Sequence, residues 1–129
     1  MQQIAKVLFK QGLEAFNKYY SSYRGYVIDN DDPDNAGRIR IYVPHVNANK
    51  NSDQWVIKKG EWSGQTEDGK AYGHHHLPQK GDLVFVEYEF GDVRYPLWVH
   101  GHSVAKEKPE EFDSPNKYAF KSPNGHLVI

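Results

Sequence analysis

Histidines are the residues of this sequence whose type and spacing could bind a metal. Three are adjacent, from His74 to His76, and a further pair is separated by one residue. Adjacent residues of an extended chain point in different directions, so at most two of the first three can converge, whereas the pair would share one face of a strand. The chain has no cysteine that could complete a thiolate site. We therefore predict no native metal site and no cofactor. The three adjacent histidines are interpreted as part of a solvated loop, and the separated pair as residues at the rim of a strand. The candidate ligands for a metal are His74, His76, His100 and His102.

An acidic stretch is the second place where cation chemistry is conceivable, because four aspartates lie between Asp29 and Asp34. Counted from Asp29, however, the sixth position lacks the Gly and the twelfth lacks the Glu that an EF-hand loop requires. Aspartate, proline and glycine are also the residues that shape tight turns. We predict a structural turn here, formed by Asp32, Pro33 and Gly37.

Motifs and charge argue against several functional classes for this chain. The sequence contains no nucleophile elbow, phosphate loop or H-E-x-x-H motif, so we predict that the chain is not an enzyme. Its net charge of -1 gives no general attraction to a polyanion, and no apolar run is long enough for stable membrane insertion. Exposed aromatic residues could stack nucleic-acid bases, which keeps a single-stranded nucleic-acid-binding role open as an alternative although no basic groove is evident.

Two predicted hairpins position the histidines and the acidic turn. Tyr23–Asp29 and Arg38–Val43 flank the acidic turn, and Leu83–Phe90 and Tyr95–His102 form the second pair, entered at Gly81-Asp82 and turned at Gly91. Alternation places one face of each strand inward. We predict a small all-β, five-stranded barrel with Glu87 or Glu89 paired to Arg38 or Arg40; its predicted inward residues are Ile39, Ile41, Val43, Val84, Val86, Tyr88 and Phe90.

The remaining segments flank or interrupt the barrel. Helical spacing of apolar residues predicts an N-terminal helix within residues 1–22, the barrel takes residues 23–105, and residues 58–80 are expected to be an irregular contact loop. Residues 106–129 combine a charged linker with two short apolar runs around a turn at Pro123–Gly125. The chain ends on an apolar run, which predicts either a longer parent chain or a strand completed by another copy.

Several of these residues, taken in order, resemble a known family. They are Gly25-Tyr-Val, Asp32-Pro33, Gly37-Arg-Ile-Arg-Ile-Tyr-Val-Pro44, Trp55, Leu77-Pro78, Gly81-Asp-Leu-Val-Phe-Val-Glu-Tyr88, Gly91-Asp92, Tyr95-Pro96 and Gly101. Over about residues 23–103 they resemble the N-terminal barrel of contractile-tail central spikes. That family includes phage baseplate spike and tail-lysozyme proteins, baseplate assembly protein V, and the VgrG tips of type VI secretion.

The resemblance implies an oligonucleotide/oligosaccharide-binding (OB) barrel that serves protein contacts and has no catalysis of its own. It implies a structural collar in a phage tail baseplate, between a hub and a β-helical spike, in a virion assembled in the host cytoplasm. Residues 121–129 look like the start of a trimeric β-helix, so a homotrimer in the full-length protein is expected. A VgrG-like module of type VI secretion is the alternative within the same family.

Overall fold

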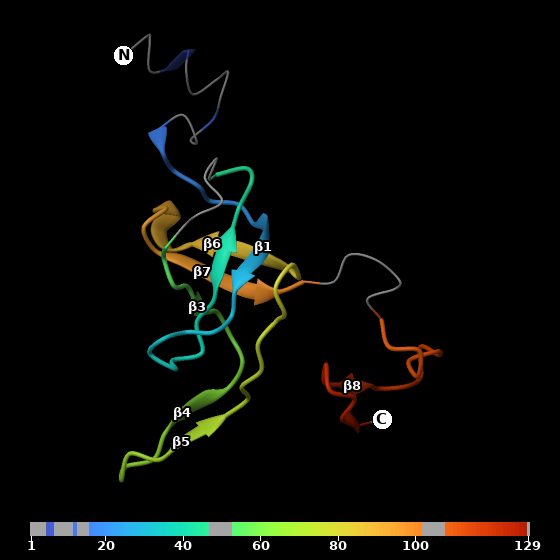
Figure 1. The fold of residues 1–129 in the computed structure, drawn as a ribbon. Coiled ribbons are helices and arrows are strands. Elements are labelled where there is room, and N and C mark those ends of the chain that lie inside the picture. Colours follow the sequence, from blue (N-terminus) through green and yellow to red (C-terminus); the bar gives the residue numbers. More distant parts are fainter. Residues whose placement is uncertain (1–4, 7–11, 13–15, 47–52, 102–107, 129) are drawn as a thin grey trace.

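The fold is built from short strands, drawn as arrows in Figure 1. The computed structural model of the chain describes residues 5–6, 12, 16–46, 53–101 and 108–128. No helix in these ranges has the length and apolar character needed to cross a membrane. The strands are β1 (Tyr23–Asp29), β2 (Arg40–Tyr42), β3 (Ile57–Lys58), β4 (Ser63–Gln65), β5 (Ala71–Gly73), β6 (Leu83–Tyr88), β7 (Pro96–His100), β8 (Phe120–Lys121) and β9 (Leu127–Val128), with a 3-10 turn, η2 (Glu89–Gly91), after β6.

Five of these strands form one curled sheet, in the order β2-β1-β6-β7-β3. Neighbouring strands are antiparallel except β3, which runs parallel to β7. The two edges meet where Ile39, beside β2, and Val56, beside β3, exchange backbone hydrogen bonds of 3.2 and 2.8 Å. The sheet therefore has the all-β, OB-like form expected from the sequence, and both predicted hairpins are confirmed.

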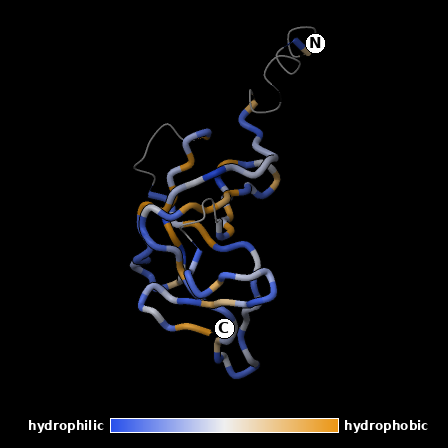
Figure 2. Tube along the Cα trace, turned by 90° about the vertical axis from the view of Figure 1, so that its right-hand side faces the viewer, coloured by the Kyte–Doolittle hydropathy of each residue, from blue (hydrophilic) through white to orange (hydrophobic). Residues whose placement is uncertain are grey.

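The core lies inside the curl of the sheet, and in Figure 2 hydrophobic residues recur along the strands that enclose it. Trp98 is fully buried there, and its indole N–H donates a 3.1 Å hydrogen bond to the carbonyl oxygen of Val56. This bond satisfies the one polar atom that the largest core side chain brings inside. Alternation correctly predicted five buried residues, namely Ile39, Ile41, Val43, Val84 and Val86.

The far end of β6 differs from the prediction. The strand ends at Tyr88, and Phe90 adopts a left-handed backbone conformation with φ of 55° inside η2. Phe90 is consequently 86% exposed, so the prediction that it faces the core is wrong. The predicted ion pair of Glu87 with Arg38 or Arg40 is also wrong, because Glu87 pairs with Lys59 at 2.5 Å.

The segment leading into β1 corrects the end of the predicted N-terminal helix. Asn17 has φ of 60°, Lys18 forms a β-bridge with Asp92, and the Tyr19 N–H donates to the Gly91 oxygen at 2.9 Å. Extended pairing here brings Tyr19 against Tyr23, with ring centroids 5.9 Å apart. Most of the predicted helix lies outside the described residues.

Two further hairpins stand outside the sheet. The region predicted to be an irregular loop contains β4 paired antiparallel with β5, and this is a correction to that prediction. β8 pairs with β9 around the predicted turn, where Gly125 has φ of 88° and donates its N–H to the Ser122 oxygen at 2.9 Å. The turn is thus confirmed, while the trimeric β-helix stays a prediction.

Candidate functional site

The β4–β5 hairpin and its two connections to the barrel, residues 61–76, form an arm that extends away from the five-stranded sheet in Figure 1. Its turn is held by hydrogen bonds between Thr66 and Lys70 and between Gly69 and Thr66. Two aromatic rings meet on the arm, since Trp62 and Tyr72 have centroids 5.2 Å apart although their residues are 67% and 40% exposed. Exposed aromatic rings on a projecting hairpin are typical of protein contact surfaces.

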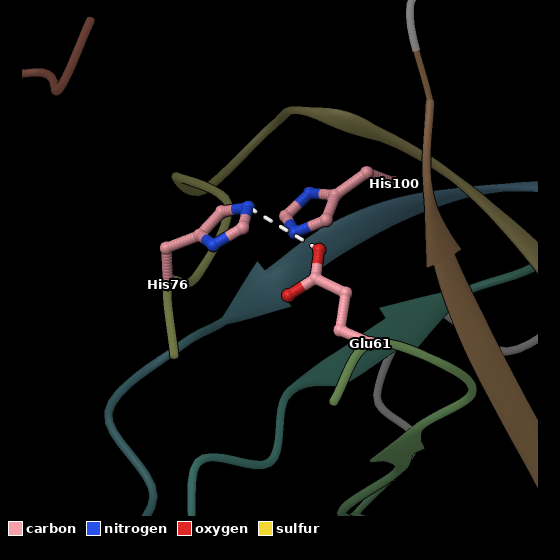
Figure 3. Close-up of side chains that lie close together, drawn as sticks. All are labelled: Glu61, His76 and His100. Carbon is pink, nitrogen blue, oxygen red and sulfur yellow. Dashed lines mark ion pairs between the residues drawn. The ribbon is translucent and has the colours of Figure 1, made fainter. Parts of the chain in front are cut away.

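Three side chains meet at the base of this arm, and Figure 3 shows them pointing toward one another. Glu61 precedes β4, His76 follows β5, and His100 ends β7. One ligand atom of each lies within 4.8 Å of the others. The two imidazoles are stacked with centroids 4.5 Å apart and planes inclined by 6°, and His76 Nε2 is 3.7 Å from Glu61 Oε1. We call these three residues the Glu-His-His cluster.

Lys58 shapes the electrostatics of the cluster. Its Nζ lies 2.7 Å from Glu61 Oε2, and this ion pair lowers the pKa of the Glu61 carboxyl. Burial lowers the pKa of His100, and the nearby positive charges of Lys58 and protonated His76 lower it further. The two pKa shifts favour an ionised Glu61 carboxylate beside a neutral His100 imidazole.

An open depression of about 610 Å³ adjoins the cluster and separates the arm from the acidic turn. Small-molecule sites are usually enclosed and mostly apolar. This depression is open to solvent, and both polar and apolar atoms line it, so it suits a protein contact better than an enclosed small ligand. The lining residues are Asn35, Ala36, Gly37, Lys58, His74, His75, His76, Leu77 and Gln79.

The acidic turn is organised around one carboxylate, that of Asp32. Asp32 is buried and accepts hydrogen bonds from the backbone N–H groups of Asp34, Ala36 and Arg38. The Arg38 guanidinium adds two more, from Nε at 2.7 Å and from Nη2 at 2.9 Å. Because its oxygens are already occupied, this carboxylate fits the structural role predicted from the sequence.

Other residues of the predicted turns have local roles. Gly81 has φ of 88° and donates its N–H to the Val27 oxygen at 2.8 Å, and Asp82 accepts a 2.8 Å hydrogen bond from the Gln79 N–H. Gly91 has no Cβ, and one built there would lie 2.6 Å from the Tyr20 ring. Pro33 and Gly37 both lie in the loop that Asp32 organises.

The four candidate metal ligands have different outcomes. His76 and His100 come together in the cluster, whereas His74 lies in the neighbouring depression, with its backbone N–H bonded to the Trp62 oxygen. His102 falls outside the described residues. Sequence reasoning missed Glu61, and no spacing could have revealed it, because folding of the arm brings it to His76.

Comparison with known families agrees with the barrel described above. A family model described as the type VI secretion system/phage-baseplate injector OB domain matches residues 23–102, which contain all five strands of the curled sheet and the arm. A search of curated proteins found no match. The matched region covers more than half of the 129 residues and confirms the resemblance noted in the sequence. The chain therefore belongs to the family of type VI secretion system and phage-baseplate injector OB domains.

Proposed function

We propose that this chain is the collar of a phage tail baseplate central spike, the part that connects a hub to a β-helical spike. The observation that carries the proposal is the family match over the whole barrel, which gives the chain a structural role in an injector. A VgrG-like collar of a type VI secretion spike is the alternative within the family. The proposed location is the baseplate of the virion.

The barrel has the construction that a collar requires. Its edges are joined by the Ile39–Val56 hydrogen bonds, and its centre is filled by fully buried Trp98. A closed, well-packed sheet resists deformation when force is transmitted through it. The mechanism is therefore mechanical coupling, with no bond made or broken by this chain.

The arm and the β8–β9 hairpin supply surfaces for contacts with the hub and with further copies of the chain. The arm presents Trp62 and Tyr72 to solvent, and this surface suits the hub. The C-terminal hairpin exposes apolar residues that an isolated chain leaves uncovered, and this surface suits assembly with further copies as a homotrimer. The exposed residues of that hairpin region are Tyr118, Phe120, Leu127 and Val128.

Immunogold electron microscopy of purified tail-like particles tests this function. Antibodies raised against the purified chain are expected to label the baseplate end of contractile particles that sediment from producing cells. Label on secreted sheath-and-tube structures without a virion head would favour the type VI alternative. A protein that remains in the unsedimented fraction, with no labelled particle, would contradict both versions of the collar.

A further inference from the structure

The Glu-His-His cluster has the composition of a metal site. Two imidazoles and one carboxylate form a donor set that zinc accepts, with a fourth position left for water. Calcium and magnesium prefer sites made wholly of oxygen donors, whereas imidazole suits zinc and its neighbours in the first transition series. The set comes from three separate segments, so it is a product of the fold and not of a histidine run.

An unpartnered polar atom points to a ligand at the same place. His100 Nε2 is buried and has no hydrogen-bond partner among the described residues. A buried polar atom without a partner destabilises a protein, and such atoms call for a physical explanation.

The geometry also shows which side chain must move. Lone pairs of imidazole nitrogens lie in the ring plane, so two parallel rings cannot both direct them at one ion. His100 packs edge-on against buried Trp98, whereas the His76 side chain is 60% exposed and free to turn about its torsions. Glu61 can contribute Oε1 while Oε2 keeps its contact with Lys58. Rotation of His76 would therefore complete the site without disturbing the core.

We propose that Glu61, His76 and His100 bind one zinc-class divalent cation that fastens both ends of the arm to β7. Glu61 and His76 flank the β4–β5 hairpin, so one ion bonded to both and to His100 fixes the direction in which the arm leaves the barrel. This site is independent of whether the chain serves a phage or a secretion apparatus.

Isothermal titration of the metal-free chain with zinc chloride tests the proposal. Protein dialysed against EDTA and then against chelator-free buffer should bind one zinc ion per chain, should not bind calcium, and should melt at a higher temperature with zinc present. Glu61→Gln and His76→Ala should each weaken zinc binding at least about tenfold. The absence of one-to-one binding in the parent chain would overturn the site.

His75→Ala is the matched control, because His75 is exposed and adjacent to His76 but outside the cluster. It should leave zinc affinity unchanged, and an equal loss in His75→Ala and His76→Ala would overturn the proposal in favour of the solvated histidine run.

Discussion

Asp32 shows how one side chain can define a loop. Its carboxylate gathers three backbone N–H groups and the Arg38 guanidinium, so the chain between β1 and β2 is folded around it. The sequence predicted a turn at this place from the types of its residues. It could not predict the arginine as partner, because that contact depends on the return of the chain six residues later.

Replacing this carboxylate should destabilise the barrel. In Asp32→Asn the amide can neither neutralise Arg38 nor accept all the N–H donors, and we expect the melting temperature to fall by about 5–10 °C. Asp34→Asn is the matched control. Asp34 also contacts Arg38, at 3.0 Å, but its side chain is 79% exposed, so the melting temperature should barely change. Equal effects of the two variants would show that burial of Asp32 is unimportant.

The ion pair between Asp32 and Arg38 makes the effect of Asp32→Asn depend on pH. Hydrogen bonds from Arg38, and secondly from backbone N–H groups, hold the pKa of Asp32 well below its usual range. The folded chain therefore keeps this carboxylate ionised at a pH where the unfolded chain protonates it, near about 3.9. The difference in melting temperature between the parent and Asp32→Asn should be constant from neutral pH to about pH 5 and should shrink as the pH falls below about 4.

At the scale of the elements, the contact between β1 and its neighbours depends on a residue without a side chain. A Cβ built on Gly25 would lie 2.6 Å from Ile41 Cγ2 and 3.2 Å from Val86 Cγ2. Ile41 and Val86 are buried and β-branched, so neither can turn away freely. Gly25 thus allows β1 to pass close to the side chains of β2 and β6.

Gly25→Ala should therefore cost about 1–3 kcal/mol of stability through overpacking, as measured by urea unfolding. Ile41→Ala, which removes the atom that the new methyl would meet, should cost about 2–5 kcal/mol alone. The double variant should lose less than the sum of the two, because the methyl partly fills the cavity. Strictly additive losses would contradict the close contact.

Sequence pattern predicted elements only where burial imposes alternation. β1 and β2 each bury one face, and β6 buries Val84 and Val86 on one face together with Leu83 at its start, so the alternation of these strands is visible in the sequence. β4 and β5 have three residues each and bury no residue fully, so nothing in their composition distinguished them from a loop. The sequence predicts that Phe90 faces inward because the apolar alternation continues past Tyr88, where β6 ends.

At the scale of the whole molecule, the sequence predicted two of the three residues of the candidate site. His76 and His100 could be named as possible ligands from residue type alone. Their meeting with Glu61 depends on the closure of the barrel and on the path of the arm, and both are long-range consequences of folding. Local sequence patterns do not predict which distant residues come together in the fold. The family resemblance, in contrast, predicted the barrel to which these residues belong.

The C-terminal hairpin gives the clearest argument about assembly. Phe120 and Val128 are directly paired across β8 and β9, and they are 68% and 66% exposed. A two-stranded hairpin is marginally stable alone, and apolar residues on its surface favour association. If these residues are covered by the same hairpin of two further chains, the protein in its natural full length should have three times the chain mass by light scattering.

Phe120→Asp combined with Val128→Asp should convert that trimer into a monomer, because association would then bury six charges without partners. Trp62→Asp is the control, since it places a charge at an equally exposed aromatic position on the arm and should leave the mass unchanged. A parent protein that stays monomeric at every concentration would refute the trimer. Dissociation by Trp62→Asp alone would assign the contact between copies to the arm and leave the hairpin without that role.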